Sequence, residues 1–145
     1  MKILILCDMF PPAFGPRMGY LCKYMKRAGW EPVVVTEQID DNTFSFLKGE
    51  TPVTYVNFFR SKGKILQKAE WICVFILDYL FHYKDKKMAK AASRLLEEGG
   101  YAGILCSSYR AFPLPAARYV AEKYHLPLVI DLRDIVEQYA SNEYI

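Results

Sequence analysis

The chain has 145 residues, of which 52% are hydrophobic, 15% aromatic and 24% charged. This length and composition exclude a mini-protein and an intrinsically disordered segment, and they predict a single globular domain over residues 1–145. The formal net charge of +3 is uneven, because residues 58–94 hold nine basic and three acidic side chains. A basic stretch confined to the middle of the chain favours an anionic surface or ligand and argues against a nucleic-acid partner.

Five short apolar runs have the composition of strands that are buried on both faces of a parallel sheet. These runs are Lys2–Cys7, Pro32–Thr36, Val53–Phe59, Gly103–Cys106 and Leu128–Ile130. The first run ends at Asp8 without a cleavage site, so it does not read as a signal peptide, and we expect a cytoplasmic protein.

Segments of helical periodicity alternate with these runs. The first has its apolar face on Met18 to Ala28 and ends at Gly29, and the last covers Leu114–Tyr124. Two more lie between the third and fourth runs, one from Ile65 to Leu80 and one from Met88 to Leu96. The alternation predicts an α/β fold: a doubly wound, mostly parallel Rossmann-like sheet in the order 3-2-1-4-5, with helices on both faces.

Four cysteines are far apart in the sequence and include no CxxC pair. We therefore expect neither a disulfide framework nor a zinc site, and we expect buried thiols in a reducing compartment. The cysteines are Cys7, Cys22, Cys73 and Cys106.

The strand order also predicts where a ligand binds. In open parallel sheets, ligands lie beyond the carboxyl ends of the strands, where the strand order reverses. Here that point falls between the first and fourth strands. It nominates three loops, Asp8–Arg17, Ser107–Pro113 and Asp131–Asp134.

The first loop ends in Gly15, Pro16 and Arg17, where a helix begins. Glycine lets a ligand approach the backbone, proline suits the first helical position, and arginine binds phosphate through charge-assisted hydrogen bonds. The alternative is a tight connection with a solvated arginine. The loop matches neither GxGxxG nor GxxxxGK[ST], so the common dinucleotide and P-loop motifs are absent.

The second loop offers Ser107 and Ser108, which either cap the next helix or bind a ligand hydroxyl. Arg110 is open to the same two interpretations, structural or ligand-binding.

The third loop places two carboxylates, Asp131 and Asp134, around the guanidinium of Arg133. These charges form either a structural ion-pair network or the charged part of a site. No histidine lies in any of the three loops, so Ser-His-Asp or Cys-His catalysis is not supported.

The segment Glu70–Tyr83 is apolar nearly all round. Besides the face from Ile65 to Leu80, it carries a second stripe on Trp71, Phe75 and Tyr79. One helix cannot bury both stripes against one sheet, so either further protein or a membrane surface covers the second. Basic residues flank the segment and favour anionic headgroups. Its uninterrupted apolar run is too short to span a bilayer.

Three parts of the sequence together resemble the N-terminal half of a two-domain, GT-B-type glycosyltransferase of the group that builds polysaccharides and glycoconjugates. These parts are MKILILCDMFPPAFGPR at the start, AGWEPVVVT after the first helix, and ILCSS with PLVIDLRD in the last two strands. The resemblance covers nearly the whole chain. It implies a Rossmann-like acceptor domain facing a second domain that binds a nucleotide sugar.

The resemblance also implies roles for the loop residues. Gly15, Pro16 and Arg17 match the turn that approaches the donor diphosphate, although the family often has a second glycine where this chain has Pro16. Ser107 and Ser108 match the loop beside the transferred sugar, and Arg110 follows them as a further candidate for ligand binding. Asp131, Arg133 and Asp134 match the charged segment of the cleft, with Asp131 or Asp134 orienting or deprotonating the acceptor.

The remaining expectations concern partners, cofactors and location. The resemblance implies a nucleotide-sugar donor as co-substrate, a saccharide or lipid-linked acceptor, no metal and no other cofactor. The apolar segment around Trp71 and its basic flanks add the expectation that a cytoplasmic protein lies peripherally at the inner face of a membrane. The C-terminal nucleotide-sugar domain is expected to be missing from this chain, which alone should be inactive. The alternative is a non-catalytic flavodoxin-like or receiver-like module that binds a small anion or a partner protein.

Overall fold

The structure, a computed structural model, describes residues 1–109 and 111–133. The strands of these ranges form one parallel sheet in the order β3-β2-β1-β4-β5, which confirms the predicted fold class and order. The strands are β1 (Lys2–Cys7), β2 (Glu31–Glu37), β3 (Val53–Val56), β4 (Tyr101–Ser108) and β5 (Leu128–Leu132). The helices are α1 (Pro16–Arg27), α2 (Lys64–Phe81), α3 (Tyr83–Leu96) and α4 (Leu114–Tyr124), with a 3₁₀ helix at Ser45–Leu47.

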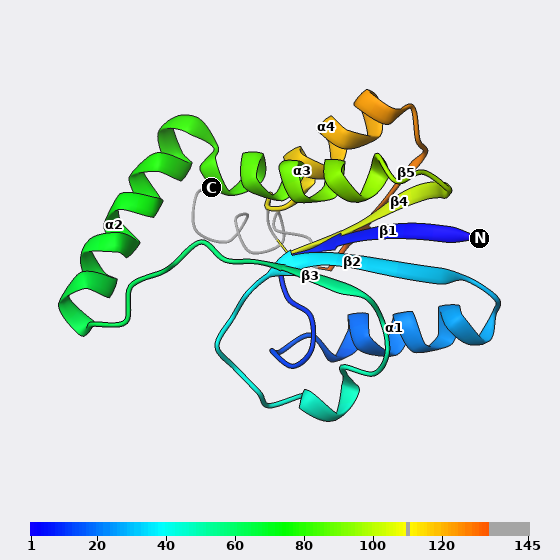
Figure 1. Ribbon diagram of the computed structural model, residues 1–145, viewed down its shortest axis with the longest axis horizontal. Helices are drawn as coiled ribbons and strands as arrows, with labels where there is room; N and C mark the ends of the chain where they lie inside the picture. Colours follow the sequence, from blue (N-terminus) through cyan, green and yellow to red (C-terminus); the bar gives the residue numbers. More distant parts are fainter. Residues whose placement is uncertain (110, 134–145) are drawn as a thin grey trace, which may run out of the picture.

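Helices cover both faces of the sheet. Figure 1 shows α1 on one face, with α3 and α4 on the other. The side chains of β1 alternate between the two cores: Ile5 shares one with Met18 of α1, and Leu4 shares the other with Met88 of α3. Because β1 is central and buried on both faces, its sequence is a continuous apolar run.

Helix α1 begins and ends as predicted. Pro16 is in its first turn, where the missing N–H of proline costs nothing. After the helix, Gly29 has a φ of +85°, which residues with a Cβ rarely adopt. The Trp30 N–H then donates to the Met25 carbonyl at 2.9 Å and closes the helix end.

The bounds of β2, β3, β4 and β5 differ from those expected, and the differences are largest at β3 and β4. β3 ends at Val56 rather than Phe59, and β4 extends beyond Gly103–Cys106 at both ends. Phe58 is nevertheless buried, because its ring packs edge-on against Phe112, with the ring centroids 6.1 Å apart. An apolar run shows that a segment is buried but does not distinguish a strand from a packed loop.

The prediction that α2 packs one face on the sheet is wrong. Ile65 is 85% exposed, and the other members of its face, from Ile72 to Leu80, are exposed as well. Val74 is the buried residue of this helix. Figure 1 shows α2 projecting away from the sheet, whose face is already filled by α3 and α4. No helix in the described ranges combines the length and apolarity needed to cross a membrane.

The prediction that the cysteines are buried is wrong for Cys73, which is exposed on α2. Its spacing fits the face of α2 that the periodicity assigns to the sheet, and that face is open because the helix stands away from the sheet. Cys7, Cys22 and Cys106 are buried as expected, and all four are free thiols.

Strand β5 forms one edge of the sheet in the part of the chain that the structure describes. Its apolar side chains are open: Val129 is 57% exposed and Leu132 65% exposed. The strand pairs in parallel with β4, in a register that sets Asp131 beside Ser107. This register brings two of the nominated loops together.

Candidate functional site

The carboxyl ends of β1, β4 and β5 meet at one rim of the sheet. β1 is hydrogen-bonded to β2 on one side and to β4 on the other, so the chain winds away in opposite directions from this point. Loops that leave adjacent strands in opposite directions open a crevice between them. The nominated residues at this rim come from three loops, of which the first and third are more than 100 residues apart in the sequence.

An ion pair joins the first and third loops. Arg17 Nη2, at the start of α1, lies 2.8 Å from Asp131 Oδ1 at the end of β5. The second carboxylate oxygen, Asp131 Oδ2, accepts a hydrogen bond from Ser107 Oγ at 3.1 Å. Arg17 is 60% exposed and Asp131 23% exposed, so the guanidinium is accessible to a ligand. The structure therefore brings Arg17, Ser107 and Asp131 together, one residue from each loop.

A second ion pair, between Arg133 and Asp8, joins the same two loops. Arg133 Nη2 donates to Asp8 Oδ1, and the same carboxylate oxygen accepts the Met9 N–H at 2.9 Å. The Arg133 N–H donates to the Ser108 carbonyl at 3.2 Å. Asp8 and Arg133 are mostly buried, so their observed contacts hold the loops. The catalytic role assigned to Arg133 stays a prediction.

Gly15 and Pro16 shape the turn before α1. A Cβ on Gly15 would lie 2.8 Å from the Met9 carbonyl oxygen and 2.9 Å from Phe10 Cα. The loop backbone itself therefore requires glycine here, since no side-chain atom fits at that distance. This packing requirement stands beside the predicted approach of a ligand, which remains untested. Pro16 is the first residue of α1, and Arg17 follows it in the same turn.

The remaining nominated residues divide into two groups. Ser108 Oγ donates to the Phe112 carbonyl at 3.0 Å and is buried, so its hydroxyl stabilises its own loop. Arg110 and Asp134 lie outside the described residues, and their predicted roles remain predictions.

A polar hollow at the same end of the sheet was not predicted. It has a volume of about 630 Å³ and is formed by the segments after β1, β2 and β3. Amide and carboxylate side chains share it with aromatic rings. The lining includes Phe10, Glu37, Gln38, Asp40, Asn57 and Phe59. Polar residues after the second and third apolar runs are a sequence signal for it, but the strand-order rule nominates only the loops at the reversal.

Glu37, which lines this hollow, is paired with a lysine that lies over aromatic rings. Lys84, at the start of α3, lies 3.3 Å from Glu37 Oε1. Its Nζ is 5.1 to 5.8 Å from the ring centroids of Phe58, Phe59 and Phe112. Burial raises the pKa of Glu37, and the neighbouring ammonium lowers it in part. A cation held over aromatic rings is stabilised by their electron-rich faces, so Lys84 fixes Glu37 at the rim.

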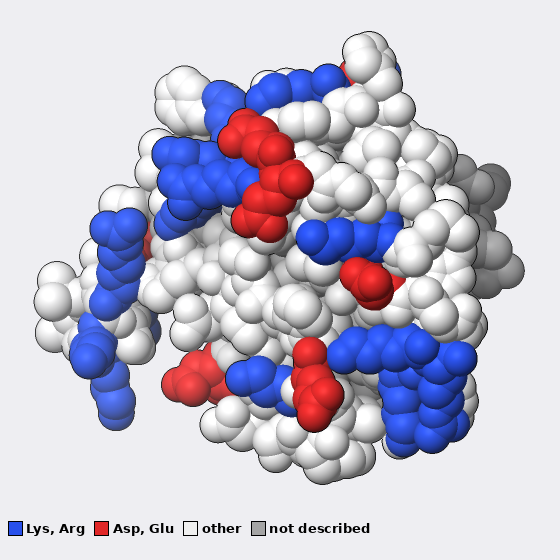
Figure 2. Space-filling view, turned by 45° about the vertical axis from the view of Figure 1, so that its right-hand side comes forward, with Lys and Arg blue, Asp and Glu red and all other residues white. Residues whose placement is uncertain are grey.

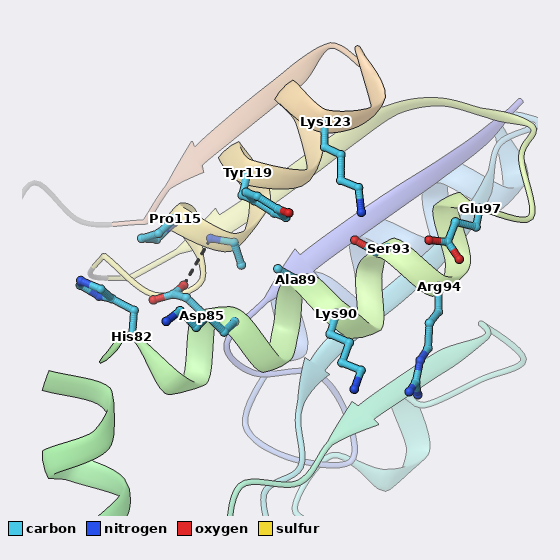
Figure 3. Close-up of a pocket in the computed structure, with 12 residues that line it drawn as sticks. His82, Asp85, Ala89, Lys90, Ser93, Arg94, Glu97, Pro115, Tyr119 and Lys123 are labelled. Atoms are coloured by element: carbon cyan, nitrogen blue, oxygen red, sulfur yellow. Dashed lines mark hydrogen bonds between the residues drawn. The ribbon is translucent and has the colours of Figure 1, made fainter. Parts of the chain in front are cut away.

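A larger groove lies between α3 and α4, away from the converging loops (Figure 3). Its volume is about 760 Å³. The Asp85 carboxylate on α3 accepts the Ala116 N–H at 3.3 Å, as the dashed line in Figure 3 shows. Burial raises the pKa of Asp85. Because this carboxylate satisfies an amide in the first turn of α4, its observed role is to join two helices.

The described residues hold neither a metal-binding cluster nor a nucleophilic thiol at the second loop. No cluster of three or more histidine, cysteine, aspartate or glutamate side chains there could hold a metal ion. Burial raises the pKa of Cys106, which precedes the second loop, to about 12. A thiol in that state is protonated at neutral pH and is a poor nucleophile.

Known proteins resemble this chain in structure rather than in sequence. No protein-family model and no curated protein sequence matches the chain. MurG from Acinetobacter baumannii matches with a TM-score of 0.57 and 10% identity over 97% of this chain and 38% of MurG. A UGT transferase from Siraitia grosvenorii, solved in complex with UDP, matches with a TM-score of 0.51 and 12% identity over 90% of this chain and 27% of its own.

The chain shares the fold of two GT-B glycosyltransferases. At 10% and 12% identity the likeness establishes the Rossmann-like fold alone. The chain also spans well under half the length of either enzyme. The resemblance suggested by the sequence and the likeness in structure therefore agree on a glycosyltransferase-like fold.

Proposed function

We propose that this chain is the acceptor-side part of a glycosyltransferase that moves a sugar from a nucleotide-sugar donor to a saccharide or lipid-linked acceptor. The activity would serve polysaccharide or glycoconjugate synthesis. The observation that carries the proposal is the Arg17–Asp131–Ser107 cluster at the strand-order reversal. The fold shared with two glycosyltransferases supports it.

In the proposed reaction, an acceptor hydroxyl oxygen attacks the anomeric carbon of the donor. The new glycosidic C–O bond forms as the bond to the nucleotide diphosphate breaks, and the diphosphate leaves with the bonding electron pair. The hydroxyl proton passes to a carboxylate, for which Asp131 is the candidate in the described ranges. Catalysis of this kind depends mainly on positioning and on stabilising the charge of the leaving group.

Arg17 is the candidate for stabilising that charge. The observed bond to Asp131 uses one N–H of a guanidinium that has five. The remaining donors are suited to bidentate contact with phosphate oxygens. If Arg17 turns to the diphosphate, Asp131 Oδ1 loses its partner and can accept the acceptor hydroxyl. The two roles are thus coupled through one ion pair.

The polar hollow formed by the segments after β1, β2 and β3 is the proposed acceptor site. Planar amide and carboxylate groups such as Gln38, Asp40 and Asn57 match the donor and acceptor pattern of sugar hydroxyls. The ring of Phe59, which is partly exposed, offers apolar surface for the C–H face of a sugar ring. A volume of about 630 Å³ accommodates a small saccharide.

The test is a titration of the isotope-labelled chain with UDP, followed by NMR. We expect amide shifts around Arg17 and Ser107 and a dissociation constant that rises at least tenfold in Arg17→Ala, the loss of a charge-assisted bidentate contact. Arg118→Ala is the control, because Arg118 is an equally charged exposed residue paired with Glu122 on α4. We expect UDP binding to be unchanged in that variant.

Two results would contradict the proposal. The first is an absence of shifts at millimolar UDP, and the second is equal loss of binding in Arg17→Ala and Arg118→Ala. A parallel titration with methyl glycosides tests the acceptor site. Shifts confined to the α3–α4 groove around Lys90, instead of the residues after β2 and β3, would remove the proposed acceptor site.

A further inference from the structure

Helix α2 carries an unusual amount of exposed apolar surface. Its exposed large apolar residues are Ile65, Leu66, Trp71, Ile72, Phe75, Ile76, Leu77, Tyr79, Leu80 and Phe81. Scattered apolar residues are normal on a protein surface, but a continuous set on one element marks a place of interaction. The helix stands clear of the sheet (Figure 1), so no other described element covers this set.

Basic and aromatic residues lie on the same side of this helix. Lys64, Lys68, Trp71 and Phe75 follow one another at intervals of four, three and four residues, which places them on one helical stripe. The rings of Trp71 and Phe75 stack, with centroids 5.9 Å apart. Lys64, Lys68 and Trp71 also line a shallow apolar hollow of about 610 Å³.

The acidic residues of α2 are engaged with the chain itself. Glu70 Oε1 accepts the Arg60 N–H at 2.7 Å, and Glu70 Oε2 accepts the Ser61 N–H at 2.8 Å. Asp78 Oδ1 accepts the Lys84 N–H at 2.8 Å. These bonds turn both carboxylates toward backbone amides, while Lys64 and Lys68 remain exposed. The stripe therefore presents positive charge beside apolar rings, and Figure 2 shows blue and white side chains together on the projecting part.

We propose that α2 docks this protein on an anionic phospholipid surface. Trp71 and Phe75 enter the boundary between headgroups and acyl chains, and Lys64 and Lys68 pair with lipid phosphates. Aromatic rings prefer that boundary, and lysine side chains reach from it to the headgroups. The basic loop residues Arg60 and Lys62 extend the positive surface beyond the helix start.

The charge of the stripe favours lipid over a second copy of the chain. A second copy would bring the same exposed lysines and no unengaged carboxylate on α2 to meet them. An anionic bilayer supplies both phosphates and an apolar interior. Helix α2 also lies beyond the carboxyl ends of the strands (Figure 1), so docking through it would set the rim of the sheet close to the membrane.

The test is cosedimentation of the chain with vesicles of 70% phosphatidylcholine and 30% phosphatidylglycerol, against vesicles of pure phosphatidylcholine. We expect binding to the anionic vesicles to exceed that to the neutral ones at least tenfold, and to fall at least tenfold between 50 mM and 500 mM salt. We expect the same loss in Lys64→Glu/Lys68→Glu, through charge, and in Trp71→Ser/Phe75→Ser, through apolar contact.

The control variant is Lys23→Glu/Lys26→Glu, which makes the same change of charge on exposed residues of α1. We expect it to keep vesicle binding within about threefold of the unmodified chain. Circular dichroism establishes that each variant is folded. The proposal is overturned if the unmodified chain ignores anionic vesicles, or if the α1 control loses as much binding as the α2 variants. Dimers that depend on Trp71, without vesicle binding, would overturn it in favour of a second copy.

Discussion

Arg133 donates a hydrogen bond to Asp8 across the end of β4, joining two residues 125 positions apart in the sequence. Asp8 follows β1 and Arg133 follows β5, so this mostly buried pair ties together the two strands that flank β4. Arg17 and Asp131 are held on the same two segments. The geometry of the candidate site therefore depends on the pair behind it.

Removal of Asp8 is expected to destabilise the fold. Asp8→Ala leaves the Arg133 guanidinium without its carboxylate partner in a site that is mostly buried, and we expect the free energy of unfolding to fall by about 2 kcal/mol. Urea denaturation measures it. Glu122→Ala breaks the exposed pair with Arg118 and should cost less than about 0.5 kcal/mol. Equal losses in the two variants would contradict the structural role of the Asp8–Arg133 pair.

Gly15 and Gly63 give a matched test of backbone packing. In Gly15→Ala the new Cβ would lie 2.8 Å from the Met9 carbonyl oxygen, so the loop must shift, at a cost of about 1–3 kcal/mol. In Gly63→Ala the nearest atom is a Leu66 side-chain carbon at 3.8 Å, so the remaining cost is the poorer capping of α2 by alanine, up to about 1 kcal/mol. Thermal denaturation measures the change in stability of each variant. If Gly15→Ala is as stable as the unmodified chain, the turn before α1 accommodates a Cβ and does not require glycine.

Stability is expected to decline at alkaline pH because of buried thiols. Burial raises the pKa of Cys22 to about 11 and of Cys106 to about 12, from an ordinary value of 9.0. Above pH 9 the unfolded chain loses these protons before the folded chain does. Each thiol's contribution is therefore complete below pH 9 and is lost as pH rises, by up to about 1.4 kcal/mol per pH unit.

The same effect can be assigned to one residue. Urea denaturation at pH 8 and pH 10 should show a smaller loss of stability in Cys106→Ala than in the unmodified chain, by about 1.4 kcal/mol. Cys73→Ala is the control, since Cys73 is exposed, and it should behave like the unmodified chain. An identical pH dependence in all three proteins would refute the burial of Cys106.

Thiol reagents are expected to distinguish Cys73 from the other cysteines. In the folded chain, Cys73 is exposed while Cys7, Cys22 and Cys106 are buried, so one thiol should react rapidly with DTNB and four should react in denaturant. Protonation in a buried site slows reaction further. Rapid reaction of two or more thiols in the folded chain would place this prediction in doubt, and Cys73→Ala identifies the reactive group.

Much of the fold follows from local sequence pattern. The apolar run of β1 and the glycine stop of α1 are short-range signals, and the strand order follows from the alternation of helical segments with buried strands. Helix α2 departs from its predicted position because periodicity indicates an apolar face without saying what lies opposite. The sheet face that Ile65 was expected to cover is occupied by Met88 and its neighbours on α3.

The amino-acid sequence predicts the loops of the candidate site but not the hollow. The rule that ligands bind at the strand-order reversal selects, from the amino-acid sequence alone, the three loops that contain Arg17, Ser107 and Asp131. The hollow at Gln38 and Asn57 depends on how the segments after β2 and β3 fold over the rim. That arrangement is set by long-range packing, which residue spacing does not record.

Among the described residues, no strand pairs with the outer side of β5, and this edge affects how the protein behaves in solution. Its outer backbone groups and the apolar side chains of Val129 and Leu132 form a template on which a strand of another molecule can assemble. Concentrated samples are therefore expected to aggregate by strand addition, without any involvement of helix α2. Titrations with UDP should therefore use dilute protein, because strand addition between molecules is rare at low concentration.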